Sequence, residues 1–277
     1  MFTKTSSETR KPMSIAFVHH KGGTGKTTSC LNIAGWFTKM NKKALVIDLD
    51  PQGNATSGLG IDRKTIDFSI YDVLFGQKNI EETILETESG IYLAPSSLDL
   101  LAAETHKPKG NGLASYSQSH MAGQVNSAAL LRQSLADMTE HFDYVLIDVP
   151  PGSTLLMING IVASENIIIP IDSGVFAYET LATLKSLVIE LNKELRVETN
   201  LLMMLLRETS ISVLDKYQTW EIKKLLNEFL VENNMPGLKI WTIPFSRKIC
   251  RAQMKGMPIS HYAPYSDAAR VYRRIAK

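Results

Sequence analysis

Residues 14–28 constrain the fold of this chain more than any other stretch. A short β-branched and aromatic run, Ile15–Val18, ends at two histidines and is followed by Lys21-Gly-Gly-Thr-Gly-Lys-Thr-Thr28, whose last residues open a helical stretch. A strand, a glycine-rich turn and a helix in this order form an anion-binding site, because glycine lets backbone N–H groups converge where a Cβ would obstruct them. The stretch therefore predicts a phosphate-binding loop.

Each residue type in this loop suits a nucleotide. Lys26 is expected to neutralise the β- and γ-phosphates, and the Thr27 hydroxyl to bind Mg²⁺. The standard pattern G-x-x-x-x-G-K-[ST] would need glycine at position 20, where this chain has His20, and an additional lysine stands at the mouth of the loop. The predicted nucleotide-binding residues here are Lys21, Gly22, Gly23, Thr24, Gly25, Lys26, Thr27 and Thr28.

Two further apolar runs end in aspartate. The run from Ala44 ends at Asp48 and Asp50, and the run from Tyr144 ends at Asp148. Because ligands of parallel α/β sheets bind at the carboxyl ends of the strands, we expect these carboxylates beside the phosphate-binding loop. Asp148 then shares the Mg²⁺ ion with Thr27, and one of Asp48 and Asp50 orients the attacking water.

Apolar runs that suit buried strands alternate with amphipathic stretches along most of the chain. The alternation predicts an α/β fold, a single-domain P-loop NTPase with a mostly parallel, doubly wound, twisted sheet flanked by helices. The segment 50–60 is expected to be an irregular loop. Strands are predicted at 15–18, 44–50, 91–95, 144–148, 166–170, 201–206 and 238–243. Helices are predicted at 30–40, 69–75, 80–85, 98–104, 128–140, 176–194, 215–232 and 265–277, with another starting near 154.

Three segments stand apart from this pattern. Residues 1–12 are expected to be a flexible basic tail before the domain, which spans 13–277, and residues 105–127, with few large apolar side chains, are interpreted as an insertion. The helical region 247–277 carries eight lysines and arginines against one aspartate, although the whole chain has a formal net charge of only +2. Such a face suits a polyanion, and a solvated helix without a partner remains the alternative.

Composition excludes several classes of protein. No apolar run approaches the roughly 20 residues that a membrane span needs, and the N-terminus lacks the apolar core of a signal peptide. Cys30 and Cys250 have no neighbours with metal-binding spacing and are too few for a disulfide framework. These features favour a cytoplasmic protein.

Four segments together resemble one protein family. The string Lys21-Gly-Gly-x-Gly-Lys-Thr resembles the deviant Walker A loop of the ParA/MinD superfamily, and the segment 48–60 is similar to the switch segment of ParA-type partition ATPases, including the Soj group. Asp148-Val-Pro-Pro-Gly152 is similar to the family's Asp-x-Pro-Pro turn. The segment from Ile243 to Pro258 resembles its Ile-Pro-Arg-Asn-x-Arg and Gly-x-Pro motifs. The insertion and the Arg207-Glu208-Thr209 region depart from the family pattern.

The resemblance implies a role for particular residues. Lys21 is the signature lysine that reaches the nucleotide of a facing subunit, and Asp50 is the hydrolytic aspartate, so that the catalytic set is Lys21, Lys26 and Asp50 and the metal set is Thr27, Asp48 and Asp148. Pro244 and Phe245 lie where the family contacts adenine, and Arg207 is assigned to the same nucleotide site. Lys248 lies where the family has a DNA-binding arginine. The predicted DNA-binding residues are Arg247, Lys248, Arg251, Arg270, Arg273 and Arg274.

The family's function is a nucleotide switch with ATP and Mg²⁺ as cofactors. It implies a homodimer that sandwiches ATP, binds DNA non-specifically and hydrolyses ATP weakly until a ParB-like or other adaptor stimulates it, in plasmid or chromosome partition on the nucleoid. The same engine could position a protein cargo such as carboxysomes or chemotaxis clusters. A MinD-like membrane ATPase, a non-hydrolysing dimer scaffold, and iron-protein or arsenite-pump relatives are the other interpretations. The helix predicted at 265–277 has little apolar surface for a membrane. The iron-protein and arsenite-pump relatives need paired cysteines.

Overall fold

The computed structural model describes residues 11–101, 127–138, 141–152, 155–172, 177–235 and 237–277. These residues contain one eight-stranded sheet in the order β3-β4-β2-β5-β1-β6-β7-β8. Neighbouring strands run parallel, except that β3 pairs with β4 in the antiparallel direction. The strands are β1 Met13–Phe17, β2 Ala44–Asp48, β3 Leu85–Glu86, β4 Tyr92–Ala94, β5 Tyr144–Asp148, β6 Asn166–Asp172, β7 Asn200–Arg207 and β8 Lys239–Ile243.

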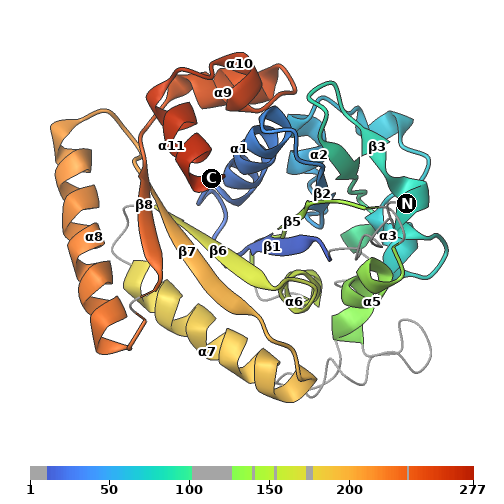
Figure 1. Ribbon diagram of the computed structural model, residues 1–277, viewed down its shortest axis with the longest axis horizontal. Helices are drawn as coiled ribbons and strands as arrows, with labels where there is room; N and C mark the ends of the chain where they lie inside the picture. The colour runs from blue at the N-terminus through green and yellow to red at the C-terminus, as the bar shows by residue number, and fades with distance from the viewer. Residues whose placement is uncertain (1–10, 102–126, 139–140, 153–154, 173–176, 236) are drawn as a thin grey trace, which may run out of the picture.

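Helices cover both faces of the sheet, which confirms the predicted doubly wound fold (Figure 1). One face carries α1, the short α2 and the C-terminal helices, and the other carries α5, α6, α7 and α8. The α-helices are α1 Lys26–Lys39, α2 Asn54–Gly58, α3 Ile70–Leu74, α5 Leu130–Ala136, α6 Leu155–Val162, α7 Ala177–Leu195, α8 Val213–Glu232, α9 Arg247–Met254, α10 Ile259–Tyr262 and α11 Asp267–Ile275. The 3₁₀ helices are η1 Arg63–Thr65, η2 Ile80–Thr83 and η4 Ser127–Ala129.

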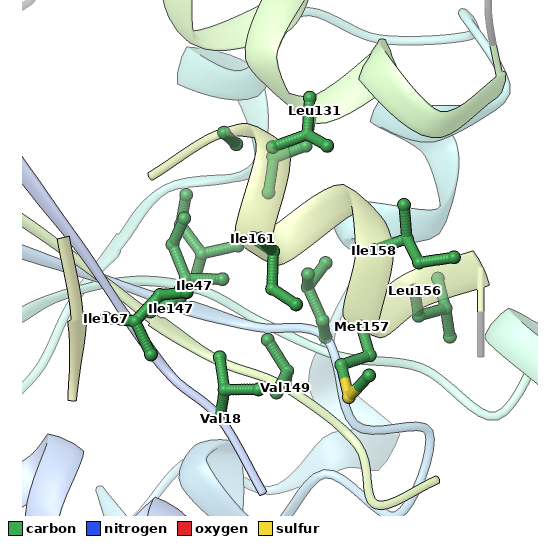
Figure 2. Close-up of a cluster of buried hydrophobic side chains, with 14 of the residues drawn as sticks. Val18, Ile47, Leu131, Ile147, Val149, Leu156, Met157, Ile158, Ile161 and Ile167 are labelled. Atoms are coloured by element: carbon green, nitrogen blue, oxygen red, sulfur yellow. The ribbon is translucent and has the colours of Figure 1, made fainter. Parts of the chain in front are cut away.

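The two layers of helices explain why the central strands are continuously apolar. Successive residues of β5 point to opposite faces, so that Ile147 packs in the core under α6 while Leu146 packs in the core under α1. Figure 2 shows the first of these cores, where Met157 and Ile161 of α6 lie against side chains from the strands. This packing fixes the central strands and therefore the loops that follow them.

Strand register brings the predicted site residues to one edge. Asp148 of β5 is the register partner of both Phe17 of β1 and Asp48 of β2. The glycine loop after β1 and the acidic ends of β2 and β5 therefore meet at the carboxyl edge of the sheet, as the sequence predicted.

Local structure differs from the sequence-based expectation at two places. The segment 50–60 is not wholly irregular, because α2 forms within it behind Gly53, whose φ of 64° is the left-handed conformation that glycine adopts readily. The predicted helix at 80–85 is the 3₁₀ helix η2, and its end instead forms the two-residue strand β3. Both elements are too short for hydrophobic periodicity to reveal.

The basic region 247–277 is helical as predicted and forms α9, α10 and α11. Residues 1–10 of the predicted tail, residues 105–126 of the predicted insertion and residues 102–104 of the helix predicted at 98–104 lie outside the described residues. Within the part of the chain that the structure describes, no helix is both long and apolar enough to cross a membrane.

Candidate functional site

The glycine loop joins β1 to α1 and is shaped for an anion. Gly23 and Gly25 have φ values of 77° and 98°, a conformation that costs other residues energy. Gly25 is the N-cap of α1, and the first turn of this helix has neither a side-chain cap nor an acidic residue. The N–H groups of that turn and the positive end of the helix dipole are therefore available to a phosphate.

Thr27 and Asp148 form the core of a candidate Mg²⁺ site. The Thr27 hydroxyl donates a 2.6 Å hydrogen bond to Asp148 Oδ2. Asp148 is fully buried, and its Oδ1 atom has no hydrogen-bond partner among the described residues. An unpaired buried carboxylate oxygen is costly, and a divalent cation would supply the missing partner. Both residues therefore fit the metal role predicted for them.

Burial disfavours the charged forms of both Asp148 and Lys26. Burial raises the pKa of Asp148 well above its ordinary value, and the nearby Asp48 raises it further. Burial also lowers the pKa of Lys26, against the opposing effect of Asp148 and Asp50. Among the described residues, no three His, Cys, Asp or Glu side chains could hold a metal by themselves. A site with one carboxylate and a hydroxyl suits Mg²⁺ bound with a nucleotide, because Mg²⁺ is usually held by one or two carboxylates together with waters and phosphate oxygens.

Asp48 differs from Asp148 because its oxygens are already occupied. Its Oδ2 accepts hydrogen bonds from the N–H and the hydroxyl of Thr56, at 2.8 and 2.7 Å, and its Oδ1 accepts one from the Asp50 N–H at 3.2 Å. Burial is the largest cause that raises the pKa of Asp48 to about 6. Direct binding of Mg²⁺ by Asp48 stays a prediction, and these contacts favour a structural role in the loop that carries Asp50.

Asp50, the predicted hydrolytic aspartate, lies just beyond β2 and is 7% exposed. Its Oδ1 accepts a 2.9 Å hydrogen bond from the Gln52 N–H. Its carboxylate is near enough to Lys26 to influence the pKa of that lysine. The structure therefore brings Lys26, Asp50 and Asp148 together at one site.

Lys21 lies at the rim of the same site with 62% of its side chain exposed. Its Nζ forms a 3.0 Å ion pair with Asp172 at the end of β6, and its N–H donates a 2.9 Å hydrogen bond to His19 Nδ1. Burial, with smaller contributions from His20 and Lys26, lowers the pKa of His19 to about 4. The neutral ring can therefore accept this bond. Sequence reasoning missed Asp172, although it follows an apolar strand as Asp48 and Asp148 do.

The other predicted nucleotide-binding residues, Arg207, Pro244 and Phe245, lie at the ends of β7 and β8. Arg207 Nη2 donates a 2.8 Å hydrogen bond to the Gly23 carbonyl, while its buried Nε has no partner among the described residues. Pro244 and Phe245 follow β8 and are half-buried. The structure therefore places Arg207 against the phosphate-binding loop, whereas contacts of Pro244 and Phe245 with adenine stay a prediction.

The six predicted DNA-binding residues are all exposed on α9 and α11, which we call the basic face together with α10. Two of them interact with other side chains. Arg270 Nη1 lies 3.7 Å from Asp267 Oδ1, and Arg273 Cζ lies over Trp36, 5.5 Å from the ring centroid. Arg247, Lys248 and Arg251 form no ion pair within the described part of the chain. Their charges are therefore available to a partner.

The basic face is attached directly to the nucleotide site. Gln253 Nε2 of α9 donates a 3.1 Å hydrogen bond to the Thr28 hydroxyl at the start of α1. Gly256 approaches Gly60 so closely that a Cβ on Gly256 would lie 2.5 Å from Gly60 Cα. The sequence did not predict the contact between Gly60 and Gly256, because the two residues are far apart along the chain.

The parallel sheet, the glycine loop and the Thr27–Asp148 pair define the class of protein as a P-loop NTPase. The profile of a family described as "AAA domain" matches residues 13–202. The chain is 30% identical over 268 residues to the sporulation initiation inhibitor protein Soj of Bacillus subtilis strain 168, covering 95% of this chain and 96% of that protein. It therefore belongs to the ParA/MinD-type family of P-loop ATPases, which confirms the resemblance drawn from the sequence.

Two solved structures show the same fold. A single-substitution variant of McdA from Cyanothece, solved as a complex with ATP, matches with a TM-score of 0.76 at 22% identity, over 96% of each chain. Cobyrinic acid a,c-diamide synthase from Mycobacterium smegmatis, solved with an ATP analogue and magnesium, matches with a TM-score of 0.73 at 23% identity, over 96% of this chain and 93% of that one.

Proposed function

We propose that this protein is an ATPase that binds ATP and Mg²⁺, closes into a homodimer and then binds DNA non-specifically to partition or position a cargo. The observation that carries the proposal is the hydrogen bond between Thr27, in the first turn of α1, and Asp148, whose buried Oδ1 has no hydrogen-bond partner among the described residues. The Soj relative and the fold shared with an ATP-bound McdA support the nucleotide and the type of function.

The site residues suit phosphoryl transfer to water. Thr27 and Asp148 would hold Mg²⁺, which neutralises phosphate charge when it is bound. Lys26 stabilises the negative charge that develops on the transferred phosphoryl group, and Asp50 orients the attacking water. Two hydrogen bonds support this division of work: Thr27 donates to Asp148, and the Gln52 N–H donates to Asp50.

The exposed Lys21 side chain suits a contact between subunits. In this structure its Nζ pairs with Asp172 of the same chain at the surface, a kind of ion pair that contributes little to stability. A triphosphate on a facing subunit offers more negative charge than one carboxylate. We therefore expect Lys21 to leave Asp172 for that nucleotide when two ATP-bound subunits meet.

Dimerisation would set two basic faces side by side. The contacts of Gln253 with Thr28, and of Gly256 with Gly60, connect each face to the loops that bind the nucleotide. Non-specific DNA binding then depends on ATP and on salt, since phosphate contacts release counterions. A ParB-like or other adaptor is expected to stimulate hydrolysis, and DNA binding would place the protein on the nucleoid of the cytoplasm.

A membrane-positioning role is less well supported by the last helix. In α11, Tyr272 is buried against the core, and Val271 and Ile275 pack partly against it. The exposed surface of that helix carries Arg270, Arg273 and Arg274. An interfacial membrane helix needs an apolar face that is free to enter the bilayer.

The test is the molar mass in solution, measured by light scattering with ATP and Mg²⁺. We use Asp50→Ala to slow hydrolysis and compare it with Asp50→Ala/Lys21→Ala, alongside ATP affinity from a fluorescent analogue. The first variant should double its mass with ATP, and the second should bind ATP and stay monomeric. Lys42→Ala in the same background is the matched control, because Lys42 also forms an exposed ion pair, with Asp143, at the opposite edge of the sheet. A monomeric first variant, or a dimer that survives Lys21→Ala, would refute the proposal.

A further inference from the structure

The loop that carries Asp50 rests on a buried hydrogen-bond network. Asp48 accepts three hydrogen bonds from this loop, two of them from Thr56 in α2. Asp48 and Thr56 are both completely buried. The network therefore fixes the two ends of the segment 50–56 to the end of β2.

Ser96 joins this network from outside the loop. It follows β4, and it is completely buried. Its N–H donates a 3.1 Å hydrogen bond to the Thr56 hydroxyl, and its own hydroxyl donates a 2.5 Å hydrogen bond to the Asp50 carbonyl. One serine thus contacts both the residue that anchors α2 and the main chain of the predicted hydrolytic aspartate.

Other hydrogen bonds also hold this loop. The Asp50 N–H donates to Asp48 Oδ1, and the Arg63 guanidinium donates to the carbonyls of Pro51 and Gln52. The Asp50 carbonyl also accepts a 2.8 Å hydrogen bond from the Gly53 N–H, which belongs to the same short turn. The Asp50 carboxylate accepts one from Gln52, also in that turn. The contacts from Gly53 and Gln52 fix the shape of the turn. Asp48 ties its N–H to β2, and Ser96 ties its carbonyl to the segment that follows β4.

We propose that Ser96 is a positioning residue for hydrolysis, which holds Asp50 at the correct distance from the nucleotide through the network with Thr56 and Asp48. The proposal rests on the ATPase function proposed above. Displacing a catalytic group by about 1 Å can lower the rate by up to about 100-fold, although the group itself is unchanged. Nucleotide affinity is expected to depend instead on the loop from Gly22 to Thr28, whereas the hydrogen bonds of Ser96 in the described part of the chain go to Thr56 and Asp50.

The test compares steady-state ATP turnover, ATP affinity and thermal unfolding for four variants. Ser96→Ala removes the hydroxyl that reaches Asp50, and Thr56→Val removes the shared hydroxyl of the network. Thr56→Ser is the conservative variant that keeps this hydroxyl. Ser97→Ala is the matched control, because Ser97 lies next in the chain but its hydroxyl bonds the exposed Asp99.

The first two variants should lower kcat about tenfold while ATP affinity stays within about twofold of the wild type. Thr56→Ser should restore most of the rate, and Ser97→Ala should leave it unchanged. Unfolding temperatures should fall by only about 2–4 °C per lost hydrogen bond. If Ser96→Ala matches Ser97→Ala in kcat, or loses ATP affinity and rate together, the positioning role is wrong. A wild-type protein that binds ATP and never hydrolyses it refutes the ATPase function itself.

Discussion

The nucleotide site and the basic face use charge in opposite ways. At the site, Asp48 and Asp148 are completely buried, and hydrogen bonds fix their positions. On the basic face, Arg247, Lys248 and Arg251 are exposed and form no ion pair among the described residues. Buried charges act through geometry and respond strongly to single substitutions, whereas exposed charges act through their number and are screened by salt.

The two regions also touch each other, and this contact makes the comparison useful. Gln253 of the basic face donates a hydrogen bond to Thr28 of the site, and Gly256 packs against Gly60 at the end of the segment 48–60. A substitution in one region can therefore be tested for its effect on the other. Substitutions of Asp148, Gly256, Arg251 and His19 test geometry, contact, charge number and protonation in turn, in order of their expected effect on function.

The largest effect is expected at the buried end of β5. Asp148→Asn keeps the shape of the side chain and removes the charge that Mg²⁺ needs, so ATP turnover should fall by about 100-fold or more. The unfolding temperature of the nucleotide-free protein should not fall at pH 7, because burial already raises the pKa of Asp148 and disfavours its charge. Phosphate release and thermal unfolding test both statements.

The matched control is Asp143→Asn, at the exposed amino end of the same segment, where the carboxylate accepts a hydrogen bond from the Lys43 N–H. This variant should keep its turnover. If Asp148→Asn hydrolyses ATP within about threefold of the wild type, Asp148 is not a metal ligand.

The contact between the regions should give the next largest effect. Gly256→Ala would place its Cβ 2.5 Å from Gly60 Cα at a φ of +67°, so one segment must move. We expect ATP-dependent DNA affinity to fall about tenfold and ATP affinity to change little. Anisotropy of a labelled duplex measures the first, and a fluorescent nucleotide measures the second.

Gly90→Ala controls for backbone strain, because Gly90 has a φ of +69° and no atom within 4 Å of an added Cβ. Both variants should lose stability by about 1–3 kcal/mol. Equal DNA affinities for the two would show that the contact with Gly60 does not couple the regions.

Single charges on the basic face should have smaller effects. Arg251→Ala should weaken DNA binding about three- to tenfold at low salt and reduce the slope of log affinity against log salt by about one, with ATP turnover unchanged. The duplex titration is repeated at several salt concentrations. Lys224→Ala is the control, because this exposed lysine lies on α8, over the other face of the sheet. A loss that is independent of salt would exclude a phosphate contact.

The smallest effect on function is expected from His19, because its substitution acts on the pH dependence of stability. Folding lowers the pKa of His19 from 6.5 to about 4. The neutral ring therefore stabilises the folded protein above pH 6.5, and this stability is lost as the pH falls from 6.5 to 4. Between pH 6.5 and 4.5, the free energy of unfolding should therefore fall by on the order of 1–2 kcal/mol less in His19→Asn than in the wild type. Guanidinium unfolding at several pH values measures the difference. The raised pKa of Asp48 also makes stability depend on pH, but it does so equally in the wild type and in His19→Asn. Parallel pH curves would contradict a buried neutral His19.

Local signals in the sequence were enough to predict the phosphate-binding loop and the acidic strand ends. The loop is encoded by neighbouring residues, and buried parallel strands are recognisable as continuous apolar runs such as 144–148. The family resemblance added the specific roles of Lys21 and Asp50. All of these residues lie at the carboxyl edge of the sheet in the structure.

The remaining features depend on contacts between distant parts of the chain. Asp172 pairs with Lys21 across 151 positions, and Ser96 bonds Asp50 across 46. Gly256 meets Gly60 only because α9 and α10 fold back over α1. The α2 helix was missed for a similar reason, since it is held by Asp48 and Gly53 and not by an apolar repeat.

The central claim is that bound ATP switches DNA binding on. The most direct measurement is the affinity of the wild-type protein for a random-sequence duplex, by fluorescence anisotropy at fixed salt, with Mg²⁺ and either a non-hydrolysable ATP analogue or ADP. Binding should be at least about tenfold tighter with the ATP analogue, because two basic faces then act on one duplex. Equal affinity with the two nucleotides would contradict the account.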